Sequence, residues 1–206
     1  MRKTGLLIFP LLLLLSGCAK QSYSVSESDF ISATEAPGAL RPAYHLLSDR
    51  FQELSQNLQF DIAIPAEMLL YDSGASDNVV RLCDPSGKNS IVLESRNKED
   101  YEKLYAEYLH SVSASMTDYH NIHIYDKEIL STGNPARHFD IKLTVSTGET
   151  DENQRDITEQ KYIRYWFLDK QNRKSEQERT AYLIIIESDQ TNVQTMMNII
   201  SQFQEF

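Results

Sequence analysis

The chain has 206 residues, of which 41% are apolar and 24% charged, and its 20 Lys and Arg against 30 Asp and Glu give a formal net charge of −10. The apolar content is enough for a real core and excludes a disordered chain, and the length fits one domain with a short accessory segment. The acidic balance excludes nucleic acid as a partner, because an acidic surface does not condense on phosphates.

The first seventeen residues have the layout of an export signal. Arg2 and Lys3 precede an apolar run from Gly5 to Leu15, which is about half the roughly 20 residues that a membrane-spanning helix needs. The run closes in Leu15-Ser16-Gly17-Cys18. Small residues before a cysteine favour processing at that cysteine, and the alternative is an ordinary secretory signal in which the cysteine is incidental.

The segment Leu15-Ser16-Gly17-Cys18 resembles the lipobox of bacterial lipoproteins. The resemblance implies that residues 1–17 are a lipoprotein signal peptide and that Cys18 receives a diacylglyceryl group on its sulfur. The protein would then be lipid-anchored to the cell membrane on its extracytoplasmic side. Loss of Arg2 and Lys3 would bring the net charge to −12, so the lipid and not charge would hold the protein at an anionic membrane.

Residues 18–41 are rich in serine and have few apolar side chains, which predicts a flexible tether. A single domain is expected over residues 42–206. Its only cysteine is Cys83, so the exported domain must be stable without an internal disulfide. Because Asp84 beside it would raise a thiol pKa, we expect Cys83 to be buried and structural.

The first part of the domain predicts one helix followed by two pairs of strands. Apolar residues at spacings of three and four predict a helix over residues 42–58. Alternation over 60–64 predicts a strand that Pro65 ends, and residues 68–71 predict a second strand. Strands over 79–83 and 90–94 flank Asp84-Pro85-Ser86-Gly87, which favours a type I turn and therefore a hairpin.

The middle of the domain begins with the clearest amphipathic pattern, which predicts a helix over residues 98–114 capped by Asn97. A strand is expected from Ile122 to Tyr125, and another over 136–145 in which apolar residues alternate with Asp140, Lys142 and Thr144. Alternation places these polar residues on a solvent face. The polar stretch 148–159 predicts an exposed loop.

The last part predicts two long strands over residues 161–169 and 179–187, and Leu183 to Ile186 should be covered on both faces. Thr191 and Gln194 form a capping box for a C-terminal helix. Its apolar face comprises Val193, Met196, Met197, Ile200 and Phe203. Short connections between strands predict an α+β fold, a mainly antiparallel sheet covered by helices.

Residues 58–206 resemble the PsbP-like fold, named for the extrinsic subunit P of photosystem II. The resemblance is carried by residues 60–65 opening the sheet, the helix at 98–114, Gly133 to Ala136 before a long strand, Tyr182 in a central strand, and a terminal helix ending near Phe203. The helix at 42–58 lies outside the pattern. The resemblance implies an assembly factor or binding module more than an enzyme.

Three histidines, His120, His123 and His138, are the candidate metal ligands, with Asp126 as a fourth group. A zinc site needs three or four such ligands. On a strand, however, positions i and i+3 point to opposite faces, so His120 and His123 could meet only in a turn. Scattered surface histidines are the favoured interpretation, and we assign no metal and no cofactor.

No catalytic motif is recognisable in the chain. Glu94 and Asp140 are expected on solvated strand faces, and Tyr162 with Trp166 should share one face of a strand. Exposed, those rings would suit protein or glycan binding, but core packing is favoured. The sequence therefore predicts a non-catalytic lipoprotein that binds or supports a protein partner in the cell envelope. The alternative is a solute-binding or metal-dependent enzymatic lipoprotein acting on cell-wall or extracellular material.

Overall fold

The computed structural model describes residues 23–24, 44–72, 78–115, 121–170, 179–190 and 199–205, together with 175, 192, 193 and 196. The signal segment 1–17 lies outside the described residues, and so do Cys18, His120, Thr191, Gln194 and Met197. Among the helices within these ranges, none has the length and apolar character required to cross a membrane.

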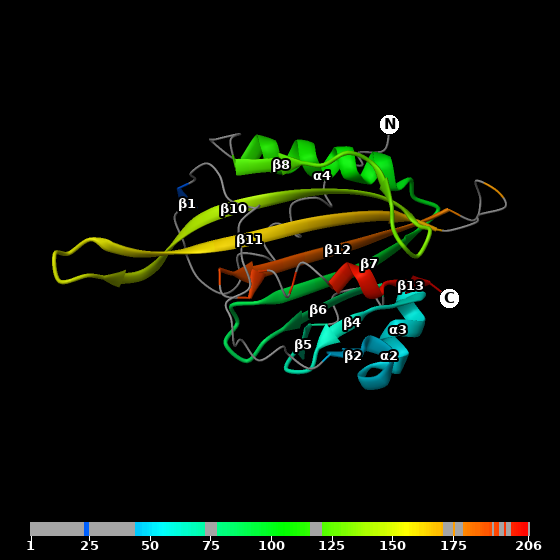
Figure 1. The fold of residues 1–206 in the computed structure, drawn as a ribbon, viewed down its shortest axis with the longest axis horizontal. Coiled ribbons are helices and arrows are strands. Elements are labelled where there is room, and N and C mark those ends of the chain that lie inside the picture. The colour runs from blue at the N-terminus through cyan, green and yellow to red at the C-terminus, as the bar shows by residue number, and fades with distance from the viewer. Residues whose placement is uncertain are drawn as a thin grey trace, which may run out of the picture.

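A nine-stranded antiparallel sheet dominates the described residues, in the order β1-β10-β11-β12-β7-β6-β5, with β8 and β9 also paired to β10 (Figure 1). Its strands are β1 Tyr23–Ser24, β5 Leu69–Asp72, β6 Val79–Cys83, β7 Ser90–Asn97, β8 Ile122–Ile124, β9 Glu128–Ile129, β10 Pro135–Thr150, β11 Asp156–Asp169 and β12 Thr180–Asp189. Every pairing is antiparallel. The predicted α+β class with a mainly antiparallel sheet is therefore confirmed.

One face of the sheet packs against helix α4, Tyr101–Ser115. Leu104 and Tyr105 share an apolar cluster with Phe139 of β10, Phe167 of β11 and Leu183 of β12, all at most 4% exposed. Helical spacing of three and four puts the α4 residues on one stripe, and strand alternation puts the sheet residues on one face. Burying each large side chain contributes about 1.5–3 kcal/mol.

The first turn of α4 is capped by Asp100 and not by Asn97 as predicted. Asp100 Oδ1 accepts hydrogen bonds from the backbone N–H groups of Glu102 (2.9 Å) and Lys103 (3.4 Å). Asn97 is instead the last residue of β7, because its strand continues past Glu94 in register with Thr180. The strand pairing therefore outweighs the capping preference of Asn97.

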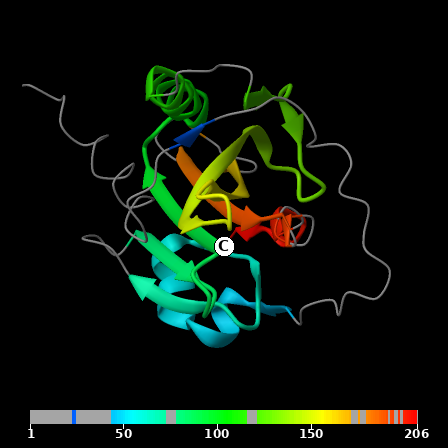
Figure 2. The same cartoon turned by 90° about the vertical axis from the view of Figure 1, so that its left-hand side faces the viewer.

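The opposite face carries a second apolar cluster, in which the segments before and after the main sheet meet. These segments are α2 Leu47–Arg50, α3 Gln52–Leu58, the two-stranded sheets β2 Tyr44–Leu46 with β4 Ala63–Pro65 and β3 Phe60–Asp61 with β13 Gln204–Glu205, and the 3₁₀ turn η3 Ile199–Gln202. Phe60, Tyr182 and Phe203 meet with ring centroids 5.1–5.4 Å apart. Figure 2 shows α4 and the α2–α3 pair on opposite sides of the strands.

The predicted helix over 42–58 is wrong at its start and is broken in the middle. Tyr44 to Leu46 form β2, because their backbone groups pair with β4. Phe51, with φ −139° and ψ 61°, interrupts the helix between α2 and α3. The strand predicted over 60–64 is likewise split, and its halves β3 and β4 pair outside the main sheet, with Pro65 inside β4 rather than after it.

The hairpin expected between β6 and β7 is confirmed, with the N–H of Gly87 donating to the Asp84 carbonyl at 3.0 Å and Gly87 at φ +70°. The stretch 148–158 is exposed, as predicted for 148–159, but the prediction of a loop over it is wrong. There β10 and β11 run on as a paired hairpin beyond the sheet (Figure 1) and turn at Asp151 to Arg155. Its side chains are polar because both faces meet solvent, which hides the strand alternation from the sequence.

The buried central strand is confirmed, because Leu183 to Ile186 of β12 are at most 1% exposed. At the C-terminus, the predicted apolar residues Val193, Met196, Ile200 and Phe203 are buried. The chain does not continue as a helix to Phe203, since residues 199–202 form η3 and residues 204–205 form β13.

Candidate functional site

The most concentrated group of charged and aromatic side chains lies where β8, β10 and β11 meet. We call it the Asp140 cluster, and it comprises Tyr125, His138, Asp140, Arg164 and Trp166. Asp140 is fully buried, and its two oxygens accept from Nε and Nη2 of Arg164, each at 2.6 Å. The Tyr125 hydroxyl donates to Asp140 Oδ2 at 2.9 Å. The expected solvent exposure of Asp140 is therefore wrong.

Strand register explains why these residues meet. Asp140 of β10 lies directly opposite Arg164 of β11, and His138 lies opposite Trp166. Alternation sends all four side chains to one face, because each pair lies two residues from the next. Tyr125 follows β8 and joins them through its backbone N–H, which donates to the His138 carbonyl at 3.3 Å. The sequence does not reveal this cluster, because the strand register that brings its members together pairs residues far apart in the chain.

His138 is stacked between two aromatic rings and is 6% exposed. Its ring centroid lies 4.0 Å from those of both Tyr125 and Trp166, at interplanar angles of 21° and 25°. Glu128 Oε1 lies 3.0 Å from His138 Nδ1 but out of line for a hydrogen bond. Burial, then the charge of Arg164, lowers the pKa of His138 to about 3. The imidazole is therefore neutral near pH 7 and unsuited to general acid catalysis.

The other members of the cluster also hold fixed charge states. Burial and the nearby Asp140 carboxylate raise the pKa of Tyr125 to about 12. Burial alone would lower the pKa of Arg164, but its hydrogen bonds to Asp140 outweigh burial and raise it. The cluster thus holds one cation, one anion and the three neutral rings of Tyr125, His138 and Trp166 at neutral pH. The contacts of Tyr125 hold the end of β8 against β10, so the role of the cluster is structural.

The candidate metal ligands that the structure describes do not come together in one site. The ring of His123 is exposed and meets Tyr125 edge-on, with centroids 4.4 Å apart, while Tyr125 stacks on His138. Asp126 is exposed. Across the part of the chain that the structure describes, no three His, Cys, Asp or Glu side chains could hold a metal ion together. Cys83 is buried, as the sequence predicts.

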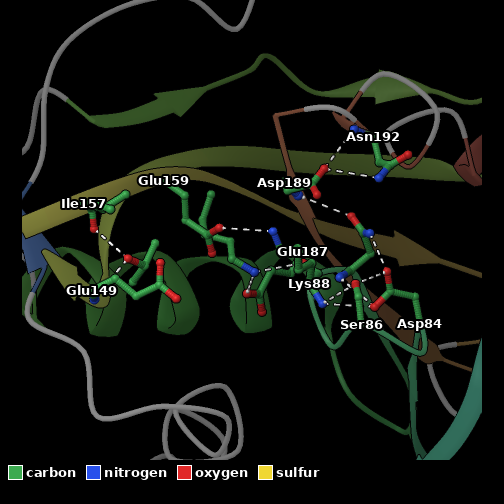
Figure 3. Close-up of polar contacts among 12 residues, drawn as sticks. Asp84, Ser86, Lys88, Glu149, Ile157, Glu159, Glu187, Asp189 and Asn192 are labelled. Atoms are coloured by element: carbon green, nitrogen blue, oxygen red, sulfur yellow. Dashed lines mark hydrogen bonds and ion pairs between the residues drawn. The ribbon is translucent and has the colours of Figure 1, made fainter. Parts of the chain in front are cut away.

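A second polar network ties the β6–β7 turn to β11, β12 and the C-terminal segment (Figure 3). Asp84 accepts from Ser86 Oγ and Asn89 Nδ2, each at 2.8 Å. Asn89 Oδ1 in turn accepts from Ser188 Oγ at 2.9 Å. Burial would raise the pKa of Asp84, but these hydrogen bonds, with those from the backbone of Lys88 and Asn89, lower it. The network is a structural joint between distant strands.

Two cations extend this joint onto β11, as the ion pairs drawn in Figure 3 show. Lys161 Nζ donates to the Lys88 carbonyl at 2.8 Å and lies 3.3 Å from Glu187. Lys88 Nζ lies 3.6 Å from Glu159. Each of these charges has an internal partner, although the Lys88 side chain remains 53% exposed.

The exposed apolar residues differ from those that the sequence analysis singled out. The aromatic residues of β11 and β12 are core, since Tyr162, Tyr165, Trp166, Phe167 and Tyr182 are all at most 6% exposed. The large exposed apolar residues of the described ranges are Tyr44, Leu69, Leu70, Tyr71, Ile124, Ile129 and Ile157. Three of them are consecutive in β5. Their run without charge was visible in the sequence, but their position at a sheet edge was not.

Comparison with known proteins does not assign the chain to a family. No protein-family model matches the chain, and no curated protein sequence matches it.

Proposed function

We propose that the protein is a lipoprotein anchored through Cys18 on the extracytoplasmic side of the cell membrane, where its domain binds or supports a protein partner without catalysis. The observation that carries the proposal is the segment Leu15-Ser16-Gly17-Cys18 after a basic start and a short apolar run. The acyl chains would supply about 0.8 kcal/mol per buried methylene.

The state of the charged groups supports a binding role over a catalytic one. The Asp140 carboxylate and the Arg164 guanidinium neutralise each other in a bidentate pair. Among the described residues, the one buried histidine is His138, which stays neutral between two rings. Catalytic sites instead combine a titrating group near neutral pH with access to substrate.

The PsbP-like fold belongs to the same proposal. It is supported by the antiparallel sheet, by the α4 residues that pack on one face, and by Tyr182 in the central strand β12. It is opposed by β3 and β4, which pair with β13 and β2 instead of opening the main sheet. We therefore base the functional proposal on the anchor and the surface of the domain, since a fold alone does not determine function.

The experiment compares the full chain with Cys18→Ser, each carrying the same C-terminal tag, together with an unrelated lipoprotein. We expect the full chain to fractionate with membranes and to enrich a specific envelope protein after mild detergent extraction. Cys18→Ser should lose the membrane fractionation. Lack of any protein enriched over the unrelated lipoprotein would contradict the binding role, and unchanged fractionation of Cys18→Ser would contradict the anchor.

The rival function, a metal-dependent enzyme, has a separate test. It is motivated by the candidate ligands His120, His123 and His138 in the sequence, of which His123 and His138 both contact the Tyr125 ring. Metal analysis of the purified protein should find no zinc that is lost on replacing both His123 and His138. Stoichiometric zinc dependent on these residues would replace the binding proposal.

A further inference from the structure

Within the described residues, one edge of the main sheet is covered by further strands and the other is not. The β10 edge carries three short strands, because β1 pairs with Thr144 and Val145, β8 with residues 139–141, and β9 with residues 135–136. The opposite edge is β5, which pairs with β6 on one side only in the described residues. An unpaired edge presents a row of backbone donors and acceptors that can receive another strand.

The side chains of this open edge are apolar and exposed. Leu69 is 52% exposed, Leu70 42% and Tyr71 59%. Leu70 lies opposite Leu82, which belongs to the apolar cluster on the α2–α3 side, so Leu69 and Tyr71 project to the other face. Edge strands of soluble proteins are commonly protected by lysine or proline, and residues 69–71 include neither.

A β-bulge limits how long an added strand can be. Leu70 pairs with Leu82, but the next registered pair is Asp72 with Arg81, which leaves Tyr71 as the extra residue. Bulges bend a strand and end regular pairing. Tyr71 is held beside the bulge by the guanidinium of Arg81, 5.3 Å from the ring centroid. The edge is therefore suited to a short, defined segment rather than to open-ended sheet growth.

The position of the N-terminal strand indicates which occupant reaches this edge. Tyr23 of β1 lies five residues after Cys18 and pairs with Val145 at the far edge of the sheet. Five extended residues reach at most about 17 Å. β5 lies six strand spacings from β1 in the sheet order, which corresponds to about 29 Å. A lipid on Cys18 would thus lie nearer to the β10 edge, and the five residues are too short to carry it to the β5 edge.

We infer that the β5 edge, residues Leu69 to Asp72, is the docking site of the protein, and that it accepts a short extended segment of an envelope protein as an added β-strand. Backbone pairing supplies affinity, and Leu69, Leu70 and Tyr71 select a segment with apolar side chains on both faces. The inference rests on the proposed function, because it locates the surface through which that partner binds.

The test uses the full lipidated chain in its own cells, with a photo-crosslinking amino acid at position 70 or, as a matched control, at Ile129. Ile129 is 71% exposed and lies in β9 at the opposite edge. We expect a crosslink from position 70 to one extended partner segment with consecutive apolar residues, which supply apolar side chains to both faces, at least tenfold above that from position 129. A synthetic peptide of that segment should bind the purified chain and protect the β5 amides from hydrogen exchange.

Substitutions then test whether peptide binding depends on the β5 edge or on another part of the protein. Leu70→Lys should weaken peptide binding at least tenfold, while Ile129→Lys should leave it unchanged, with both variants folded by circular dichroism. Crosslinks only to lipid, crosslinks only to a second copy of this chain, or equal crosslinking at both positions would each overturn the inference. If a partner still enriches on the full chain when Leu70→Lys has no effect, the docking site is wrong and the proposed function stands.

Discussion

At the scale of single residues, the molecule depends on pairing its buried charges. Asp140 has no exposed surface, and the bidentate contact with Arg164 together with the Tyr125 hydroxyl satisfies both carboxylate oxygens. Removing one partner of such a pair leaves an uncompensated charge in a poorly solvated place. The contribution of the pair is therefore best measured by removing both partners.

Asp140→Ala should lower the free energy of unfolding by about 3–5 kcal/mol, because Arg164 keeps its charge without a counter-ion. The double variant Asp140→Leu with Arg164→Met should lose less than the sum of the single variants. Urea unfolding measures both quantities. Asp126→Ala, at an exposed aspartate of the same region, should change stability by less than about 0.5 kcal/mol. Additive losses would show that the two side chains are not coupled.

Asp84 gives a prediction with a defined pH dependence. Hydrogen bonds to its carboxylate lower its pKa in the folded protein, so it stabilises the fold above its unfolded pKa of about 3.9 and this contribution is lost as pH falls through the folded value. Asp84→Asn should cost about 0.5–1 kcal/mol near pH 7. The difference from the original protein should vanish at acid pH, and a constant difference in denaturant unfolding from pH 7 to pH 2 would contradict this origin.

Residue-scale prediction from the sequence was limited by register. The burial of Cys83 and of the aromatic side chains in β11 and β12 was predictable from their neighbours. The Asp140–Arg164 pair was not, because the alternating pattern marks Asp140 as a solvent-facing residue. Only pairing with a strand 24 residues further along places the Arg164 guanidinium against it.

At the scale of elements, the helices that follow a clean pattern were predictable and the mixed ones were not. Helix α4 shows its stripe in the sequence and occurs within three residues of the predicted bounds. The segment 42–58 has helical spacing too, but its residues 44–46 form strand β2 because they pair with β4. Tertiary pairing outweighs a local pattern when the segment has an available strand edge beside it.

The true N-cap of α4 provides a test at this scale. Asp100→Ala should lower stability by about 1–2 kcal/mol, because the helix loses its side-chain acceptor for the N–H groups of Glu102 and Lys103. Asp100→Asn keeps an acceptor and should cost less, losing mainly the 2.7 Å ion pair with Arg179. Thermal unfolding compares the two. Equal losses from both variants would mean that the ion pair, and not the cap, stabilises this turn.

At the scale of the whole molecule, the sheet has one edge that is covered and one that no described residue covers. The covered edge holds β1, the described strand nearest in sequence to Cys18, and the open edge holds the exposed Leu69, Leu70 and Tyr71. Anchoring at one edge and docking at the other would let one rigid sheet bridge a membrane and a partner. This arrangement depends first on whether Cys18 carries lipid.

Mass spectrometry of the N-terminal peptide from the chain exported by its own cells tests that claim most directly. We expect a peptide that begins at Cys18 and carries the added mass of a diacylglyceryl group on its sulfur, with residues 1–17 removed. An unmodified Cys18, or an exported chain that still begins at Met1, would contradict the account.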